Sequence, residues 1–301
     1  MRFLSNRNVI FSLAILTGLA FPQLAPWTEP LTLPVLALVM TLATMNIPDN
    51  FFTSFRSLLI PSITGILMNY LILGGATLAM SALIIHQEDI WIGFVLIAAV
   101  PPAVAVIPFT NILEGNLTYT LAGTAATYLA ALIIMPLMFL FFLGMSFTAP
   151  QKLIMIMILL IAFPVVASRI IIRSGIHNRV APYQGLLTNW GFFIVLYTLV
   201  GLNQETIFRE PLMLIPVATV IFVSTFLLGF LIELIGRFFK IHQKNLISLV
   251  LLGTMKNQGI AGGLALSLFT RESALPAAVS SVFLILFFMW LDIKRHWKSG
   301  L

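Results

Sequence analysis

The amino-acid sequence predicts an all-α polytopic membrane protein with about ten transmembrane helices. Of its 301 residues, 60% are hydrophobic and only 9% are charged, whereas about a quarter of the residues of a soluble domain are charged. Apolar runs long enough to cross a bilayer recur along the chain, and the alternating pattern typical of a membrane β-barrel is absent. This composition excludes a soluble protein, a disordered chain and a nucleic-acid-binding protein, despite a net charge of +6.

The apolar runs are separated by charged residues or by Pro and Gly. A run of about 20 mostly apolar residues is long enough for one helical span. The runs near 58–85 and 117–146 are longer than that, so we expect these two helices to tilt or kink. The predicted spans lie near 8–23, 31–47, 58–85, 90–113, 117–146, 152–173, 184–203, 211–236, 245–269 and 274–293.

The distribution of Lys and Arg predicts the orientation of the chain. An even number of spans puts both termini on one side of the membrane, and that side carries most of the cations; Lys152, Arg209 and Arg271 fall on the other. Because cytoplasmic loops are rich in Lys and Arg, we predict cytoplasmic termini. We also expect the protein to reside in a bacterial inner membrane. The basic segment Met1–Asn8 before an apolar run also fits a signal peptide, whose removal would leave an odd number of spans.

The predicted spans divide into two halves, residues 1–150 and 151–301, with five spans in each. An odd number of spans per half gives the halves opposite orientations in the membrane, which is the inverted repeat found in many transporters. The loops between the spans are too short for an extramembrane domain. The function must therefore be carried by residues inside the spans.

The fourth span of each half is irregular. In the first half, near 100–108, Pro101, Pro102 and Pro108 follow one another closely, and interior prolines remove helix hydrogen bonds and clash with the preceding turn. In the second half, near 253–259, a polar run lies between Gly253 and Gly259. We predict two discontinuous helices whose unwound segments are buried in protein or line a cavity. The alternative is a pair of kinked packing helices with no binding site.

Lys256 is the only charged residue predicted to lie in the middle of the membrane. A Lys at the centre of a membrane helix costs about 2.5–3.5 kcal/mol on insertion scales, and its distance from both ends of the span hinders snorkelling to an interface. Three functional interpretations remain open: attraction of an anionic substrate, transfer of a proton, or a fixed charge that replaces a metal cation. A structural interpretation is that the ammonium holds the unwound helix ends together.

Other polar residues are predicted near the two breaks and could bind a substrate or an ion. Each alone more often holds helices together than binds a ligand, but as a set they form a candidate site. The four His lie at span ends without metal-ligand spacing, there is no Cys, and no phosphate loop or nucleophile constellation is present, so we predict no metal site, no cofactor and no enzyme activity. The additional candidate residues are Thr254, Asn257, Gln258, Asn69, Thr110, Asn111, Thr120 and Thr124.

Three segments resemble the bile acid:sodium symporter family. Residues 36–45, LALVMTLATM, are similar to the Leu-Ala-Leu-Ile-Met-Phe pattern of the family's second helix. Residues 100–116 align without gaps with its Val-Pro-Gly-Gly-Thr-Ala-Ser-Asn stretch and end on the same Gly-Asn pair. Residues 254–261, TMKNQGIA, resemble its Gly-Met-Gln-Asn-Ser-Gly-Leu-Ala run. The resemblance extends over nearly the whole chain, and its two crossing-helix motifs are moderately specific together.

The resemblance implies a fold and an activity. It implies ten helices arranged as a panel domain and a core domain, each formed jointly by both halves, with two discontinuous helices crossing at the membrane centre. It also implies import of organic anions together with sodium. Among the implied sodium ligands, the hydroxyl groups are retained as Thr120 and Thr124, and Asn69 stands where the family has a Gln.

The other implied sodium ligands are replaced. Val106 and Ile107 stand at the positions of a Ser-Asn pair, Leu252 at the position of a Glu, and Lys256 at the position of a Gln. Two unit charges 4 Å apart repel by about 4 kcal/mol at an effective dielectric constant near 20, so an ammonium at this position opposes sodium binding. We therefore expect that the two usual sodium sites are not both functional in this chain.

The sequence favours a secondary transporter of a small organic anion with altered or lost sodium coupling, in which Lys256 is a fixed or protonatable charge. The alternative is a non-transporting receptor or regulatory membrane protein on the same scaffold. The replacement of the implied sodium ligands supports this alternative as well. A channel is disfavoured because the chain has too few polar residues for a continuous polar stripe. The expected partners are the solute and the lipid bilayer, with no nucleic acid and no obligate protein partner.

Overall fold

The computed structural model describes residues 7–45, 55–144 and 150–299, and within these ranges the chain is helical with one isolated β-bridge. The first half contains α1 Arg7–Ala20, η2 Pro22–Leu24, α2 Ala25–Thr28, η3 Glu29–Leu31, α3 Thr32–Thr44, α4 Phe55–Ile66, η5 Leu67–Gly74, α5 Gly75–Ile84, α6 Glu88–Ala99, α7 Val106–Ile112 and α8 Leu117–Phe142. The second half contains α9 Pro150–Met157, η7 Ile158–Ala162, α10 Phe163–Arg173, α11 His177–Val180, η8 Ala181–Tyr183, α12 Gln184–Leu202, α13 Gln204–Arg209, α14 Pro211–Phe222, η9 Val223–Leu227, α15 Leu228–Phe238, α16 Gln243–Leu252, α17 Gln258–Leu268, η10 Glu272–Ala274 and α18 Leu275–Ser299.

Seven helical stretches of the described chain are long and apolar enough to cross a membrane. Three further apolar helices are shorter: Val9–Ala20, Gln243–Leu252 and Gln258–Leu268. Large apolar side chains point outward along the long helices; Phe141 and Phe238, for example, are each 81% exposed. Exposed apolar surface on this scale suits contact with lipid rather than water. The protein is therefore an all-helical membrane protein, as the composition predicts.

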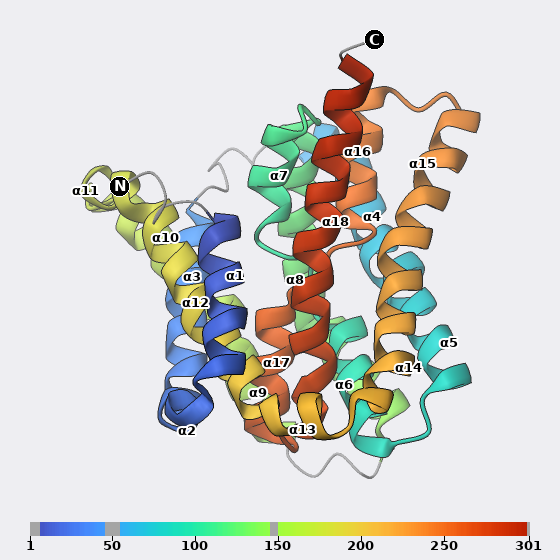
Figure 1. Ribbon diagram of the computed structural model, residues 1–301. Helices are drawn as coiled ribbons and strands as arrows, with labels where there is room; N and C mark the ends of the chain where they lie inside the picture. The colour runs from blue at the N-terminus through green and yellow to red at the C-terminus, as the bar shows by residue number, and fades with distance from the viewer. Residues whose placement is uncertain (1–6, 46–54, 145–149, 300–301) are drawn as a thin grey trace.

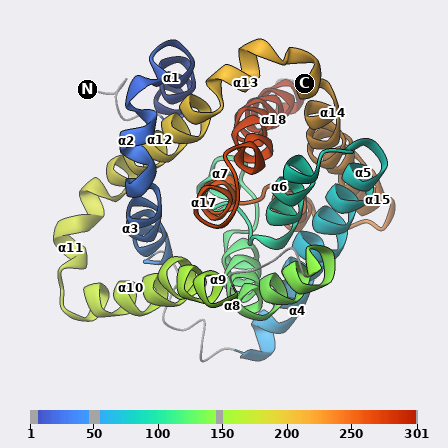
Figure 2. The same ribbon diagram turned by 90° about the horizontal axis from the view of Figure 1, so that it is seen from below.

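The helices pack into two groups that lie side by side (Figures 1 and 2). The flanking group consists of α1–α3, α10 and α12, in which α12 packs against α1, α2 and α3, and α10 packs against α3. The crossing group consists of α4–α8 and α14–α18, in which α4 packs on α8, α7 on α16 and α17 on α18. The groups meet where α17 contacts α3 and α12. Each group combines helices from both halves of the sequence.

Basic residues are concentrated at one end of the molecule. Figure 1 shows the start of α1, the end of α18, α11, and the turn between α15 and α16 at that end, whereas α2 and α13 lie at the other. The first set of elements carries Arg7, Arg179 and Arg237, and α13 carries Arg209. The elements rich in Lys and Arg therefore lie together, as the predicted even number of spans requires.

The two runs predicted to tilt or kink contain different features that can bend a helix. The run near 58–85 contains a π-helical segment, η5, between α4 and α5. The run near 117–146 forms one helix, α8, with Pro136 inside it. Both π-segments and interior prolines are recognised causes of helix bending. The tilt or kink expected of the two helices stays a prediction, and these two features are the places where a bend would occur.

Gly65 and Gly123 allow α4 and α8 to pack with their backbones in close contact. A Cβ atom placed on Gly65 would lie 2.5 Å from Gly123 Cα. Small residues at such crossings are the usual means of bringing membrane helices together, because van der Waals packing drives their association.

The substitution Gly65→Ala is expected to destabilise the protein, because the added methyl group meets backbone atoms that cannot move aside. Overpacking of this kind costs about 1–3 kcal/mol. Gly75→Ala in α5 is the matched control, since nothing lies within 4 Å of a Cβ at that position. The melting temperature of the purified protein in detergent measures both variants, and equal values would contradict this account of the crossing.

Candidate functional site

Two interrupted helices cross at the centre of the structure. α6 ends at Ala99 and the chain resumes as α7 at Val106, while α16 ends at Leu252 and α17 begins at Gln258. The two intervening segments run antiparallel, with Pro102 opposite Lys256. Backbone hydrogen bonds join them: Ala103 N–H donates to Met255 O (3.0 Å) and Asn257 N–H donates to Pro101 O (3.0 Å). Each broken helix thus satisfies backbone groups of the other, which makes unwound backbone tolerable inside a membrane.

The predicted break residues divide into two kinds. Pro101, Pro102 and Gly253 lie in the unwound segments. Pro108 lies in the first turn of α7 instead, where a missing N–H is harmless because the first N–H groups of a helix have no partner within it. Gly259 lies in the first turn of α17, where a Cβ would meet a Leu36 methyl group at 2.9 Å. Pro108 and Gly259 therefore lie within helices and not in the breaks, which corrects the expectation for these two residues. The small size of Gly259 instead permits close packing against α3.

The Lys256 side chain is 1% exposed, and its ammonium is surrounded by protein oxygens. Lys256 Nζ donates to Asn69 Oδ1 (2.7 Å), Ala98 O (2.7 Å) and Val100 O (2.9 Å). It also lies 4.7 Å from the centroid of the Tyr70 ring, within the range of a cation–π interaction. All three donors of the ammonium are therefore occupied. The carbonyls belong to the carboxyl end of α6, where the helix dipole favours a cation.

The π-segment η5 supplies the other contacts to this ammonium. Asn69 and Tyr70 both lie in η5 and are buried. Gly74 in the same segment allows α6 to approach, because a Cβ there would lie 3.1 Å from Ala98 O. Short π-segments often occur at functional sites, and here the segment places an amide oxygen and an aromatic face beside the crossing. Asn69 Nδ2 has no hydrogen-bond partner among the described residues.

Asn257 connects the second broken helix to α8. Its Oδ1 accepts from Ile260 N–H (3.1 Å) and caps α17, and its Nδ2 donates to Tyr128 Oη (3.0 Å). The Tyr128 hydroxyl in turn donates to Pro102 O (3.0 Å). One phenol of α8 therefore bridges the two unwound segments.

The substitution Tyr128→Phe is expected to lower the melting temperature, because it removes the hydroxyl that bridges Pro102 and Asn257. Each hydrogen bond of this kind contributes about 0.5–1.5 kcal/mol, and a buried group left without a partner adds to the cost. Tyr183→Phe is a suitable control, since the Tyr183 side chain is exposed. A Tyr128→Phe variant that melts with the wild type would show that the bridge contributes nothing to stability.

The remaining candidate residues do not all converge on the crossing. Thr110 and Thr120 lie with their hydroxyl oxygens 2.9 Å apart, and Thr124 Oγ1 is buried without a partner among the described residues. Thr254 lies in the unwound segment and its hydroxyl donates to Val250 O of the preceding helix, α16, and Asn111 is exposed. At the positions where the family resemblance implies other sodium ligands, the structure places the apolar residues Val106, Ile107 and Leu252.

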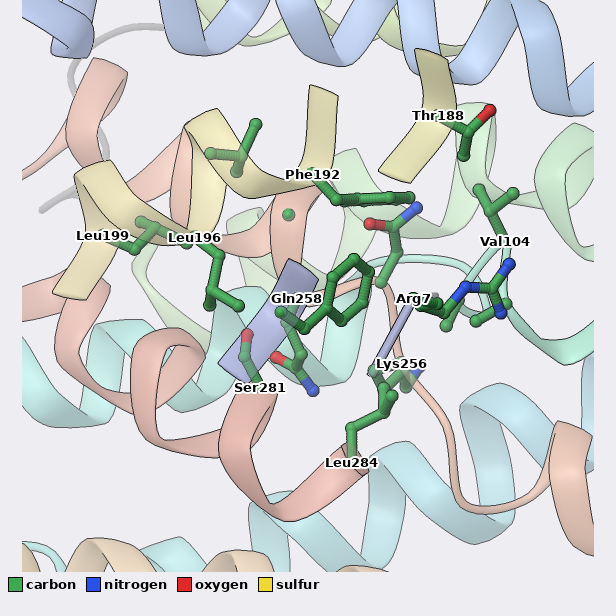
Figure 3. A pocket seen from close by; sticks show the side chains of 16 residues that line it. Arg7, Val104, Thr188, Phe192, Leu196, Leu199, Lys256, Gln258, Ser281 and Leu284 are labelled. Carbon is green, nitrogen blue, oxygen red and sulfur yellow. The ribbon is translucent and has the colours of Figure 1, made fainter. Parts of the chain in front are cut away.

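A cavity of about 60 Å³ lies between the two helix groups, beside the crossing. Figure 3 shows it from close by. Gln258 lines it, together with the chain of Lys256 and part of Asn257. Most of the other lining side chains are apolar and come from α1 and α12. The main ones are Phe11, Phe192, Val195, Leu196 and Leu199.

Sequence reasoning missed three residues of this region: Arg7, Tyr70 and Tyr128. Arg7 lies at the predicted start of the first span, on the side rich in Lys and Arg, and the structure shows that it lines the cavity. Tyr128 follows Thr124 by four residues, so the helical repeat alone places both on one face of α8. Tyr70 is adjacent to Asn69, and only the π-segment turns both toward Lys256. The helical repeat could therefore have identified Tyr128, but not the other two.

Two comparisons with known proteins identify the family of this chain. The model of the sodium bile acid symporter family matches residues 33–210, which include the first interrupted helix but not the second. The chain is also 22% identical over 269 residues to a Bacillus subtilis (strain 168) protein named as an uncharacterized sodium-dependent transporter, YocS. This match covers 88% of this chain and 83% of that protein. The family match extends over more than half of the chain. This protein therefore belongs to the sodium bile acid symporter family, a family of membrane transporters and not of enzymes.

Proposed function

We propose that this protein is a secondary active transporter that moves a small organic anion by alternating access, with the Lys256 ammonium in place of a coupling sodium ion. The observation that carries the proposal is the contact of Lys256 Nζ with Asn69 Oδ1, Ala98 O and Val100 O. Unwound carbonyls and the carboxyl ends of half-helices are the groups with which transporters coordinate sodium. Here a tethered cation occupies such a set of oxygens.

The packing supports a ten-helix inverted repeat. The seven long stretches, α1 and the two interrupted helices, α6–α7 and α16–α17, together make ten spans. The interrupted helices are then the fourth span of residues 1–150 and the fourth span of residues 151–301. In this proposal the flanking group is the panel domain, the crossing group is the core domain, and transport moves one against the other.

Electrostatics support altered sodium coupling. A sodium ion 4 Å from the ammonium would be repelled by about 4 kcal/mol at an effective dielectric constant near 20. Among the described residues, no acidic side chain lines the cavity beside Lys256 to offset that repulsion. The relative from B. subtilis is named sodium-dependent, so this chain would differ from it in not requiring sodium.

The concentration of basic residues at one end supports an orientation with both termini in the cytoplasm. Cytoplasmic segments next to membrane spans carry an excess of Lys and Arg. Together with the bacterial relative, this supports residence in a bacterial inner membrane.

Uptake into proteoliposomes tests the proposal. A panel of labelled small organic anions is offered with sodium outside, and again with sodium replaced by N-methylglucamine. We expect uptake of at least one anion at equal rates in both media, because the cation that the site needs is part of the chain. Strict sodium dependence would contradict the altered coupling, and binding without flux across the panel would favour the receptor alternative.

A further inference from the structure

The cavity beside the crossing carries a positive charge from an unexpected element. Arg7, the first residue of α1, lines it together with Lys256, and no Asp or Glu is among the lining residues that the structure describes. The Arg7 guanidinium lies over the Phe109 ring of α7, 5.0 Å from its centroid. It therefore sits between the flanking group and the crossing group, where a transported solute would pass.

The two cations of the cavity differ in what they can offer to a ligand. The three donors of Lys256 are occupied by protein oxygens. Within the described part of the chain, the Arg7 hydrogen bond runs from Nε to Asn189 Oδ1 (3.3 Å). The two terminal amino groups of a guanidinium form a planar fork that matches a carboxylate. Those of Arg7 make no hydrogen bond to the described residues, so they can bind a ligand.

The rest of the cavity indicates the size and polarity of the remainder of that ligand. Figure 3 shows Arg7 at the end of the pocket opposite Leu196 and Leu199. A volume of about 60 Å³ holds only a few water molecules, which suits a short aliphatic chain better than a steroid. Gln258 Oε1 is buried without a partner among the described residues and supplies one further polar atom.

We infer that Arg7 binds the carboxylate of the transported solute, and that the solute is a compact monocarboxylate whose apolar part rests against α12. This inference rests on the proposed transport function and adds the residue and the substrate class. Phe109, below the guanidinium, holds the fork in place from the crossing group. Arg7 is thereby the group that detects the negative charge, while Lys256 supplies the internal cation.

Direct binding to the purified full-length protein tests the inference separately from transport. The probes are 4-methylpentanoate, its neutral amide 4-methylpentanamide, and taurocholate as a large anion, and calorimetry measures their affinities for wild type, Arg7→Gln and Arg7→Lys. We expect 4-methylpentanoate to bind wild type, and the amide and taurocholate to bind at least roughly 10-fold more weakly. Arg7→Gln should weaken carboxylate binding by roughly 10- to 100-fold, the range for a hydrogen bond to a charged group.

Controls separate the role of Arg7 from folding. Arg179→Gln removes an exposed cation from α11 at the same end of the molecule and should leave affinity unchanged. Arg7→Lys keeps the charge without the fork and should bind with intermediate affinity, which a merely structural role would not predict. Melting temperatures without ligand show whether each variant is folded.

Three results would overturn the inference: equal carboxylate affinity in wild type and in a folded Arg7→Gln variant, equal affinity for the acid and the amide, or no binding of 4-methylpentanoate to wild type. Carboxylate binding as expected but without flux in proteoliposomes would instead refute the transport proposal and leave the Arg7 site standing. Anion uptake that is insensitive to Arg7→Gln would refute the site and leave transport standing.

Discussion

The substitution Lys256→Met is expected to abolish uptake, with a loss of more than roughly 100-fold, and to lower the melting temperature. Met has a similar unbranched shape but no donors. Its introduction leaves Asn69 Oδ1, Ala98 O and Val100 O without the ammonium that they contact in the wild type. A buried polar group that loses its partner costs about 1–3 kcal/mol. Because these oxygens belong to η5 and α6, their loss loosens the crossing itself.

Uptake into proteoliposomes and melting in detergent measure this effect together. The matched control is Lys244→Met, which removes an exposed Lys from the start of the same broken helix. We expect the control to transport and melt like the wild type. Uptake by Lys256→Met within a factor of about two of the wild type would contradict any role for the internal ammonium.

The substitution Lys256→Gln is expected to make uptake sodium-dependent. It removes the tethered charge and supplies one more oxygen, beside Asn69 Oδ1, Ala98 O and Val100 O. Oxygens at the carboxyl end of a half-helix favour a small cation. We expect uptake by this variant to be roughly 5-fold or more faster with sodium than with N-methylglucamine, a difference of about 1 kcal/mol. The wild type should show no such difference.

Two further measurements test whether the sodium dependence of Lys256→Gln comes from the added oxygen. Lys256→Met should show no stimulation by sodium, because Met adds no oxygen ligand. Lys256→Gln measured over a range of pH distinguishes a fixed charge from a proton carrier: loss of a pH dependence present in the wild type would identify Lys256 as the proton carrier. A Lys256→Gln variant that is folded and active but indifferent to sodium would refute the idea that the ammonium occupies a cation site.

The class of protein and the positions of its helix breaks could be predicted from local sequence. Low charge and long apolar runs are sufficient to predict membrane helices, because each span must be apolar wherever it packs. Pro101 and Pro102 remove backbone donors in any environment, so they interrupt a helix without help from tertiary contacts. The same local argument fails for Pro108 and Gly259, since their effect depends on their position within a helix and on the neighbouring Leu36.

Lys256 could also be found by sorting charges along the chain, since it is the only charged residue predicted to lie in the middle of a span. Its partners could not be found in this way. Asn69 and Ala98 are 187 and 158 residues distant in sequence, and the π-segment that presents Asn69 and Tyr70 has no signature in the apolar pattern. The role of Tyr128 likewise depends on the crossing, because only the crossing places Pro102 and Asn257 within hydrogen-bond distance of its hydroxyl.

The sequence by itself therefore determined that this protein spans a membrane, where two of its helices are interrupted, and which residue carries an isolated charge between them. Hydrophobicity, proline geometry and charge are properties of short segments, so they can be evaluated without the fold. Only the tertiary structure decided which oxygens surround Lys256 and that Arg7 lines the cavity rather than the membrane surface. Contacts between distant segments depend on how the helices pack, and apolar helices carry little sequence information about their neighbours.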